Sequence, residues 1–185
     1  MKTIFLTIFV ATNSLYSAQI TKGFWLIGGD GSLSYSNDVR TSNFDNIEST
    51  YNVGVIELSP NIGLFFIDKL AVGISGNYKQ TFSKNEKSYY DISISPFLKY
   101  YLLPSENSFN FFTQASYKFY FNNQSTIGWK SYKLKIGGVL FVNNIVGYEF
   151  SIEYDRTKFN NIFGNYGKTN MLTFGVGIQI HLEKN

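Results

Sequence analysis

The fold is indicated most clearly by the stretch LTFGVGIQIHL at residues 172–182, near the end of the chain. Apolar residues at every second position alternate there with small or polar ones, namely Thr173, Gly175, Gly177, Gln179 and His181. Successive side chains of a strand point to opposite faces, so this pattern predicts a strand with one apolar face and one small or polar face. The stretch IELSPNIGLFF at residues 56–66 alternates in the same way.

The same alternation recurs along the chain and predicts eight antiparallel strands. They cover residues 23–35, 51–66, 70–80, 89–102, 109–121, 131–142, 146–156 and 171–182. Each reaches the roughly 9–11 residues that a tilted strand needs to cross a bilayer. The connections alternate between short turns and longer polar segments, the latter at residues 36–50, 81–88, 122–130 and 157–170. Outer-membrane barrels have short periplasmic turns and longer outer loops, so both termini are expected on the periplasmic side.

The first residues have the features of a cleavable secretory signal. Lys2 provides the positive charge, residues 4–11 the apolar run and Ser17-Ala18 the small residues for cleavage. The run is far shorter than the roughly 20 residues of a spanning helix. We therefore expect a signal peptide at residues 1–18 and one β-barrel domain at residues 19–185. The chain has no cysteine and a formal net charge of only +3, which argues against disulfides and against nucleic-acid binding.

The volume of a small barrel indicates which face meets lipid. The interior of an eight-stranded barrel is just wide enough to be filled by side chains, so the many large apolar residues would overfill it. The apolar face is therefore expected to point outward into a membrane, with Arg156 as its only charge, at an outer strand end. Interfacial aromatic residues are expected near the strand ends, at Trp25, Phe66, Tyr78, Tyr90, Tyr100, Phe109, Tyr148 and Tyr154.

The opposite face carries small residues together with nearly balanced charges. Buried charges need partners, so we expect a salt-bridged, hydrogen-bonded plug in the lumen. Its acids are Asp30, Glu57, Asp91, Glu149, Glu153 and Asp155, and its bases are Lys79, Lys99, Lys118, Lys133 and Lys135. The same charges could instead line an ion pathway, although a structural polar core is favoured at this barrel size. Pro60 and Pro96 lie within predicted strands and lack a backbone donor, so we expect local bulges there.

Four segments carry a family resemblance: KGFWLIGG at 22–29, ELSPNIG at 57–63, IDKLAVG at 67–73 and GVGIQIHL at 175–182. Through them the mature chain resembles the small outer-membrane β-barrel domain proteins of Gram-negative, Bacteroidetes-type bacteria, which are similar in build to OmpA and OmpX barrels. The resemblance implies an integral barrel of the outer membrane, inserted by the barrel-assembly machinery, and no catalytic residues. One departure is the C-terminus, where Leu182 is followed by Glu183-Lys184-Asn185 instead of a terminal aromatic residue.

These features favour a protein without catalysis, cofactor or metal, whose role is structural, envelope-stabilising or adhesive. Three alternatives remain open: a narrow, porin-like channel for ions or small solutes, a lipid-modifying enzyme, and a soluble secreted barrel. The enzyme would have to use His181, the only histidine of the chain, as part of a site with a serine and an acid. We expect His181 to be a polar residue of the rim or lumen.

The longer connections are the places where partners other than lipid would bind. Aromatic residues at Phe44, Phe159, Phe163 and Tyr166 could contact a surface protein or a glycan, or could fold down onto the barrel rim. Acids at positions 38, 45 and 48 do not have the spacing of a known calcium loop, so no metal site is predicted. The expected partners are therefore outer-membrane lipid, the assembly machinery and a surface protein or glycan, but no nucleic acid.

Overall fold

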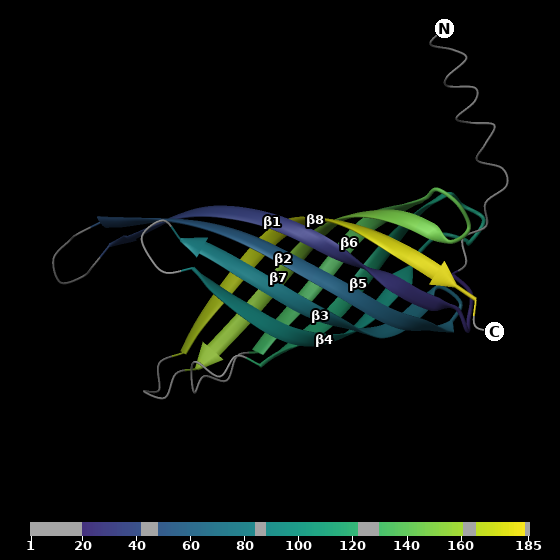
Figure 1. Ribbon diagram of the computed structural model, residues 1–185, viewed down its shortest axis with the longest axis horizontal. Coiled ribbons are helices and arrows are strands. Elements are labelled where there is room, and N and C mark those ends of the chain that lie inside the picture. Colours follow the sequence, from purple (N-terminus) through teal and green to yellow (C-terminus); the bar gives the residue numbers. More distant parts are fainter. Residues whose placement is uncertain (1–19, 42–47, 84–87, 122–129, 161–165, 184–185) are drawn as a thin grey trace, which may run out of the picture.

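The computed structural model describes residues 20–41, 48–83, 88–121, 130–160 and 166–183. These residues form eight strands that close into a barrel, each pairing antiparallel with its neighbours in sequence (Figure 1). The strands are β1 (Trp25–Thr41), β2 (Glu48–Ile67), β3 (Leu70–Ser83), β4 (Tyr89–Tyr101), β5 (Phe109–Tyr120), β6 (Lys130–Phe141), β7 (Val146–Asn160) and β8 (Tyr166–Leu182). The predicted eight-stranded, up-and-down antiparallel barrel is thus confirmed. The predicted signal peptide lies outside the described residues.

Closure is made by β1 and β8, which pair from Trp25↔Leu182 to Leu33↔Phe174. The start of β1 and the end of β8 therefore lie at the same end of the barrel, which we call the terminal end. The opposite end, where β1 connects to β2 and β7 to β8, is the loop end. Among the described residues, no helix is long and apolar enough to cross a membrane.

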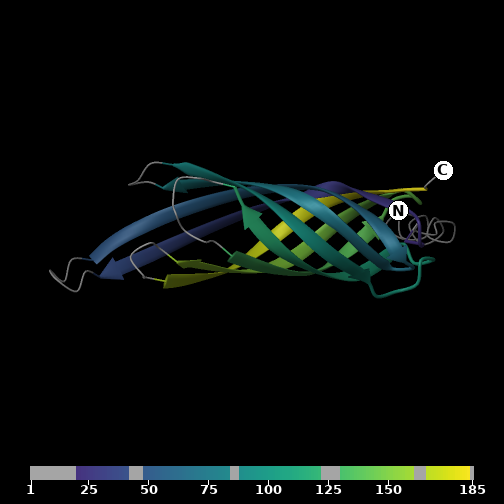
Figure 2. The ribbon, with the colours of Figure 1, turned by 90° about the horizontal axis from the view of Figure 1, so that it is seen from below.

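Two hairpins extend farther at the loop end than the sequence predicts. The β1–β2 ladder continues to Thr41↔Glu48, and the β7–β8 ladder continues to Asn160↔Tyr166. Figures 1 and 2 show the β1–β2 hairpin projecting beyond the rest of the barrel. The prediction of loops at 36–50 and 157–170 is therefore wrong for most of those residues. Beyond the bilayer a strand needs no apolar face, so polar residues can continue a ladder whose backbone hydrogen bonds are still satisfied.

This extension also changes the place of the predicted loop aromatics. Phe159 and Tyr166 belong to β7 and β8, so they are strand residues. Phe44 and Phe163 lie outside the described residues.

The predicted bulges at the two prolines are absent. Pro60 keeps its register opposite Gly29 in β1, and Pro96 keeps its register opposite Ile74 in β3. On the other side of each proline the ladder is interrupted, but the register before and after the gap is unchanged. The register shift that does occur in the β2–β3 ladder lies between Phe65 and Ile67. A local loss of pairing on one side is enough to accommodate the missing N–H, so no extra residue is needed.

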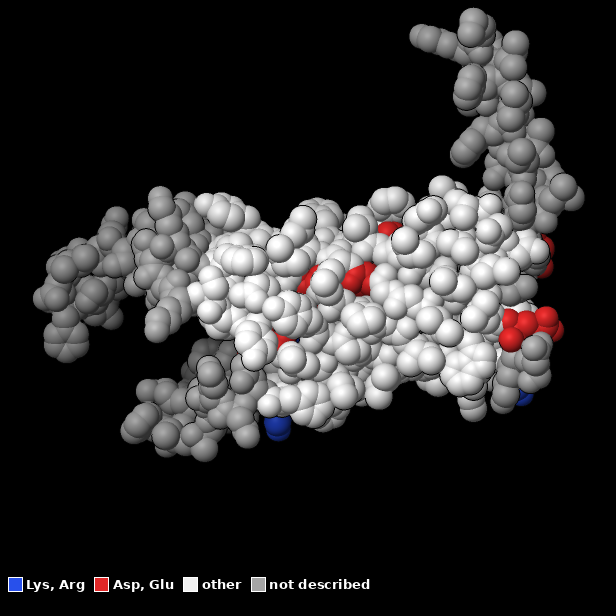
Figure 3. All heavy atoms as spheres, in the orientation of Figure 1, with Lys and Arg blue, Asp and Glu red and all other residues white. Residues whose placement is uncertain are grey.

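The outward face of the barrel is apolar, as predicted. Along β4, Ile92, Ile94 and Leu98 are exposed, whereas Ser93 and Ser95 between them are buried. Exposed large apolar residues occur on every strand. Figure 3 shows the side in view as almost entirely uncharged, with a few acidic atoms visible between the strands and other charges toward the ends. Such a surface is suited to hydrocarbon and not to water.

Candidate functional site

Charged side chains from β1, β2, β5, β6 and β7 meet inside the barrel and alternate in sign. We call this group the charge chain; in order of contact it consists of Asp155, Lys118, Glu57, Lys133, Glu153, Lys135 and Asp30. No side chain in it is more than 10% exposed. The arrangement follows from strand parity, since each of these residues lies at an inward position of its strand.

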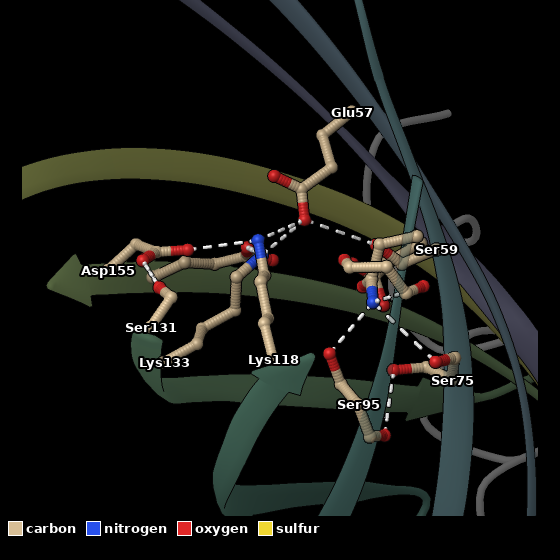
Figure 4. Close-up of polar contacts among 12 residues, drawn as sticks. Glu57, Ser59, Ser75, Ser95, Lys118, Ser131, Lys133 and Asp155 are labelled. Atoms are coloured by element: carbon tan, nitrogen blue, oxygen red, sulfur yellow. Dashed lines mark hydrogen bonds and ion pairs between the residues drawn. The ribbon is translucent and has the colours of Figure 1, made fainter. Parts of the chain in front are cut away.

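The part of the charge chain nearer the loop end is centred on Glu57. Lys118 Nζ lies 2.8 Å from Glu57 Oε1 and 2.9 Å from Asp155 Oδ2, while Lys133 Nζ lies 2.9 Å from the same Glu57 oxygen (Figure 4). Ser131 Oγ donates a hydrogen bond to Asp155. Strand β2 is not adjacent to β5 or β6 in the barrel. The ion pairs of Glu57 therefore cross the lumen and do not run along the wall.

The rest of the charge chain continues through Glu153 to Asp30. Lys133 Nζ lies 2.8 Å from Glu153 Oε2, and Lys135 Nζ lies 2.9 Å from Glu153 Oε1. Lys135 Nζ also lies 2.8 Å from Asp30 Oδ2, which joins β6 to β1 across the lumen. Each lysine of the charge chain thus contacts two carboxylates, and this double pairing offsets the cost of removing the charges from water.

A separate ion pair joins Lys99 of β4 to Glu149 of β7, again across the lumen. The hydroxyl of Tyr101 donates to Glu149 Oε1 at 3.4 Å, and Gln179 Nε2 donates to Glu149 Oε2 at 3.5 Å. Lys99 Nζ also lies 4.1 Å from the centroid of the Phe112 ring, within the range of a cation–π contact. This pair has no second lysine or second carboxylate among the described ion pairs.

The two remaining predicted lumen residues lie beside the charge chain. Lys79 of β3 and Asp91 of β4 are register partners, and Lys79 is also the register partner of Glu57. Both are half-buried, and neither has an ion pair within the part of the chain that the structure describes. The structure therefore brings all the other predicted lumen charges into ion pairs and leaves these two at the margin.

Small polar residues line the lumen wall on β3 and β4. Asn77 Nδ2 donates to Ser95 Oγ at 2.8 Å and to the backbone oxygen of Ser93 at 3.4 Å. Ser75 Oγ donates to the backbone oxygen of Ser95 at 3.4 Å (Figure 4). These bonds satisfy polar groups on the wall and leave the centre of the lumen to the charged side chains.

The terminal end of the lumen is filled by rings, which the sequence reasoning missed. We call this group the aromatic floor; it consists of Phe65, Tyr101, Phe112, Phe141 and His181. The His181 ring centroid lies 5.5 Å from that of Phe65, 5.9 Å from Tyr101 and 5.3 Å from Phe141. All five side chains are at most 3% exposed. The floor touches the Lys99–Glu149 pair through Tyr101 and Phe112, so the two groups block successive levels of the lumen.

A signal for this floor exists in the sequence. The apolar alternation breaks into adjacent apolar pairs near the terminal end of four strands: Phe65-Phe66, Tyr100-Tyr101, Phe111-Phe112 and Leu140-Phe141. In each pair one residue must point into the lumen. Inward glycines make room for the rings, since a Cβ on Gly137 would lie 2.9 Å from Phe112 Cζ.

His181 is placed in the lumen at the terminal end, fully buried between rings. The hydroxyl of Ser151, a serine of β7, donates a hydrogen bond to Glu153 Oε1 at 3.3 Å. Within the described residues, no group of three His, Cys, Asp or Glu side chains is arranged to hold a metal ion. The described ring contacts of His181 with Phe65, Tyr101 and Phe141 pack it into the aromatic floor.

The predicted interfacial aromatics lie on the outward face, and all eight are exposed. Trp25, Phe66, Tyr100 and Phe109 lie near the terminal ends of β1, β2, β4 and β5. Nearer the loop end, Tyr78 stacks on Tyr90 with ring centroids 6.1 Å apart. The remaining two, Tyr148 and Tyr154, are outward residues of β7.

Comparison with protein-family models gives no match, and comparison with curated protein sequences gives none. Among solved structures, the chain is similar to the outer membrane protein OprG from Pseudomonas aeruginosa. The two share 12% of aligned residues at a TM-score of 0.55, over 91% of this chain and 100% of OprG. With a sequence identity this low, the structural similarity shows that the two chains share a fold. The closed eight-stranded barrel, its apolar outer face and this likeness support the predicted localisation: the chain is an outer-membrane β-barrel.

Proposed function

We propose that the protein is a structural barrel of the outer membrane whose lumen is closed to ions and solutes. The observation that carries the proposal is that ion pairs cross the lumen between non-adjacent strands, directly above a floor of buried rings. A mobile ion would have to break paired, desolvated charges at one level and displace aromatic side chains at the next. Both steps are energetically costly, because they separate buried ion pairs and disturb a packed core.

Conductance in planar bilayers tests this proposal against the narrow-channel alternative. The wild-type protein should give no steady single-channel steps. The double variant Tyr101→Ala/Lys133→Ala removes one large side chain from the aromatic floor and one from the charge chain, and it should give measurable conductance steps. It therefore serves as the positive control for insertion into the bilayer. Reproducible, ion-selective steps from the wild-type protein would refute the closed lumen and favour the channel.

The lipid-modifying enzyme is tested separately by substitution of His181. The structural proposal expects that His181→Ala leaves the lipid composition of the outer membrane unchanged, because the His181 ring is buried against the rings of the aromatic floor. Lipids extracted from cells that make either protein would be compared by mass spectrometry. Loss of a modified lipid species in the variant, with the barrel still inserted, would support the enzyme instead.

The family, the route of membrane insertion and the role of the hairpins are part of the same proposal. The resemblance in sequence favours a place among the small barrels of Bacteroidetes-type bacteria that are similar to OmpA and OmpX, and insertion by the barrel-assembly machinery. The two projecting hairpins at the loop end favour an adhesive contribution, because they carry peptide backbone well beyond the closed part of the barrel. Cell-surface labelling of those hairpins in intact cells would test their orientation.

A further inference from the structure

The outward face of the barrel has one charged sector. Among strand residues whose side chains are described, the outward positions carry only three charged groups, Lys130, Arg156 and Lys158. All three are cations, all are exposed, and all lie on β6 and β7 near the loop end. Only Arg156 was expected on this face from the sequence, because the predicted sixth strand began at residue 131, one residue after Lys130, and the predicted seventh strand ended at residue 156, two residues before Lys158.

The register places these cations above a graded surface. Lys130 pairs with Lys158, and Tyr132 pairs with Arg156 in the next outward row. The following rows pair Leu134 with Tyr154 and Ile136 with Ile152. Successive outward rows are roughly 6–7 Å apart along a strand. Within a short distance, the surface therefore changes from aliphatic to aromatic to cationic, which is the sequence of environments from acyl chains to headgroups.

A surface pocket of about 360 Å³ lies within this sector. Its walls are Tyr132, Leu134, Tyr154, Arg156 and Lys158, so it joins an apolar base to a cationic rim. The Tyr154 hydroxyl is held by a hydrogen bond to Asn170 Oδ1 at 3.0 Å, with Asn170 being the register partner of Arg156. The aromatic wall is thus ordered by a contact from β8.

The pairing of like charges in this sector needs a counter-charge. Directly opposed lysines on neighbouring strands destabilise a sheet, yet Lys130 and Lys158 are in register. The nearest outward side chains that the structure describes on the flanking strands include no acid: Phe119 lies on β5, Phe121 follows it, and Asn170 and Leu172 lie on β8. An anion from outside the chain would remove the repulsion.

We propose that this basic sector, Lys130, Arg156 and Lys158 with Tyr132 and Tyr154, binds the phosphate of an anionic lipid in the leaflet at the loop end. The acyl chains of the lipid lie along Leu134 and Ile136, and its headgroup contacts the cations. Arg156 has the planar donors suited to two phosphate oxygens. The proposal depends on membrane insertion and is independent of whether the lumen conducts.

Native mass spectrometry of the folded protein in non-ionic detergent tests the proposal. The probes are phosphatidylglycerol, which is anionic, and phosphatidylcholine, which is zwitterionic. The wild-type protein should retain phosphatidylglycerol in preference to phosphatidylcholine. In the double variant Arg156→Gln/Lys158→Gln the ratio of the two retained lipids should fall about five-fold for each cation removed, on the order of 30-fold in all. The matched control Lys22→Gln/Lys69→Asn removes the same charge near the terminal end and should keep the wild-type preference.

Three results would overturn the proposal: an unchanged preference in the double variant, an equal loss in the control, or displacement of the lipid by glycerol phosphate at equal concentration. The last would assign the sector to a free anion, since glycerol phosphate has no acyl chains. Heat-dependent migration in gels checks that each variant is folded. If the double variant does not fold, Lys130→Gln alone should lower the preference about five-fold, and failure to do so is equally decisive.

Discussion

Removal of Lys99 should destabilise the barrel more than removal of a lysine from the charge chain. Lys99 is the described ionic partner of Glu149, so Lys99→Met leaves a carboxylate buried at 3% exposure with only Tyr101 and Gln179 as neutral donors. Breaking a buried pair by removing one partner costs about 3–5 kcal/mol. The lost cation–π contact with Phe112 adds to this cost.

Lys133→Met provides the matched comparison. Lys133 contacts Glu57 and Glu153, but after its removal Glu57 keeps Lys118 and Glu153 keeps Lys135. No carboxylate is left without a lysine, so the cost should be smaller, about 1–3 kcal/mol, the range for weakening hydrogen bonds to charged groups. The double variant Lys99→Met/Glu149→Met removes both charges and should recover most of the loss, because replacing a whole buried pair by apolar groups is often neutral.

The assay is reversible unfolding by urea in lipid vesicles, followed by tryptophan fluorescence and by heat-dependent migration in gels. The free energies of unfolding of the single variants Lys99→Met, Lys133→Met and Glu149→Met and of the double variant Lys99→Met/Glu149→Met would be compared with that of the wild-type protein. Equal losses for Lys99→Met and Lys133→Met would refute the argument from redundancy. A double variant that is as unstable as the sum of Lys99→Met and Glu149→Met would refute the pairing itself.

Three further outcomes are expected. Gly73→Ala should cost about 1–3 kcal/mol in the same assay, because its Cβ would lie 2.5 Å from Phe97 Cζ, whereas Gly76→Ala on the same strand meets nothing within 4 Å and should be nearly neutral. Ile136→Arg, in the middle of β6, should cost about 2–4 kcal/mol, and Tyr35→Arg near the loop end about 0–1 kcal/mol; equal costs would contradict the placement of the lipid belt. The protein should stay in the membrane fraction after carbonate or high-salt washing, and release without detergent would favour the soluble barrel.

Most of the fold could be predicted from the sequence because strand parity is a local property. The side chain of Ile94 is exposed and that of Ser95 is buried because neighbouring residues of a strand point to opposite faces. This alternation can be predicted without knowing which strands pair. The ends of the strands were harder to predict. Outside the bilayer, polar residues such as those of the β1–β2 hairpin can extend a ladder as readily as they form a loop, so hydrophobic pattern carries no signal there.

The candidate site could be predicted as a set of inward charges but not as a set of contacts. Glu57 and Lys133 are 76 residues apart in sequence and meet only because β2 and β6 face each other across the closed sheet. The aromatic floor was missed for a related reason. Strand parity places Phe65 inward once Phe66 is outward, but the sequence does not show that inward rings of β2, β4, β5, β6 and β8 meet at the same level.

By itself, the sequence determined that the chain forms amphipathic strands with an apolar outer face, since period-two patterning is read one strand at a time. Only the tertiary structure decided which charges pair, how the terminal end is closed and where the cations of the outer face gather. Those outcomes depend on register and closure, which set the distance between strands far apart in the chain. The sequence of one strand predicts which face each side chain lies on, but the contacts of that side chain depend on the closed barrel.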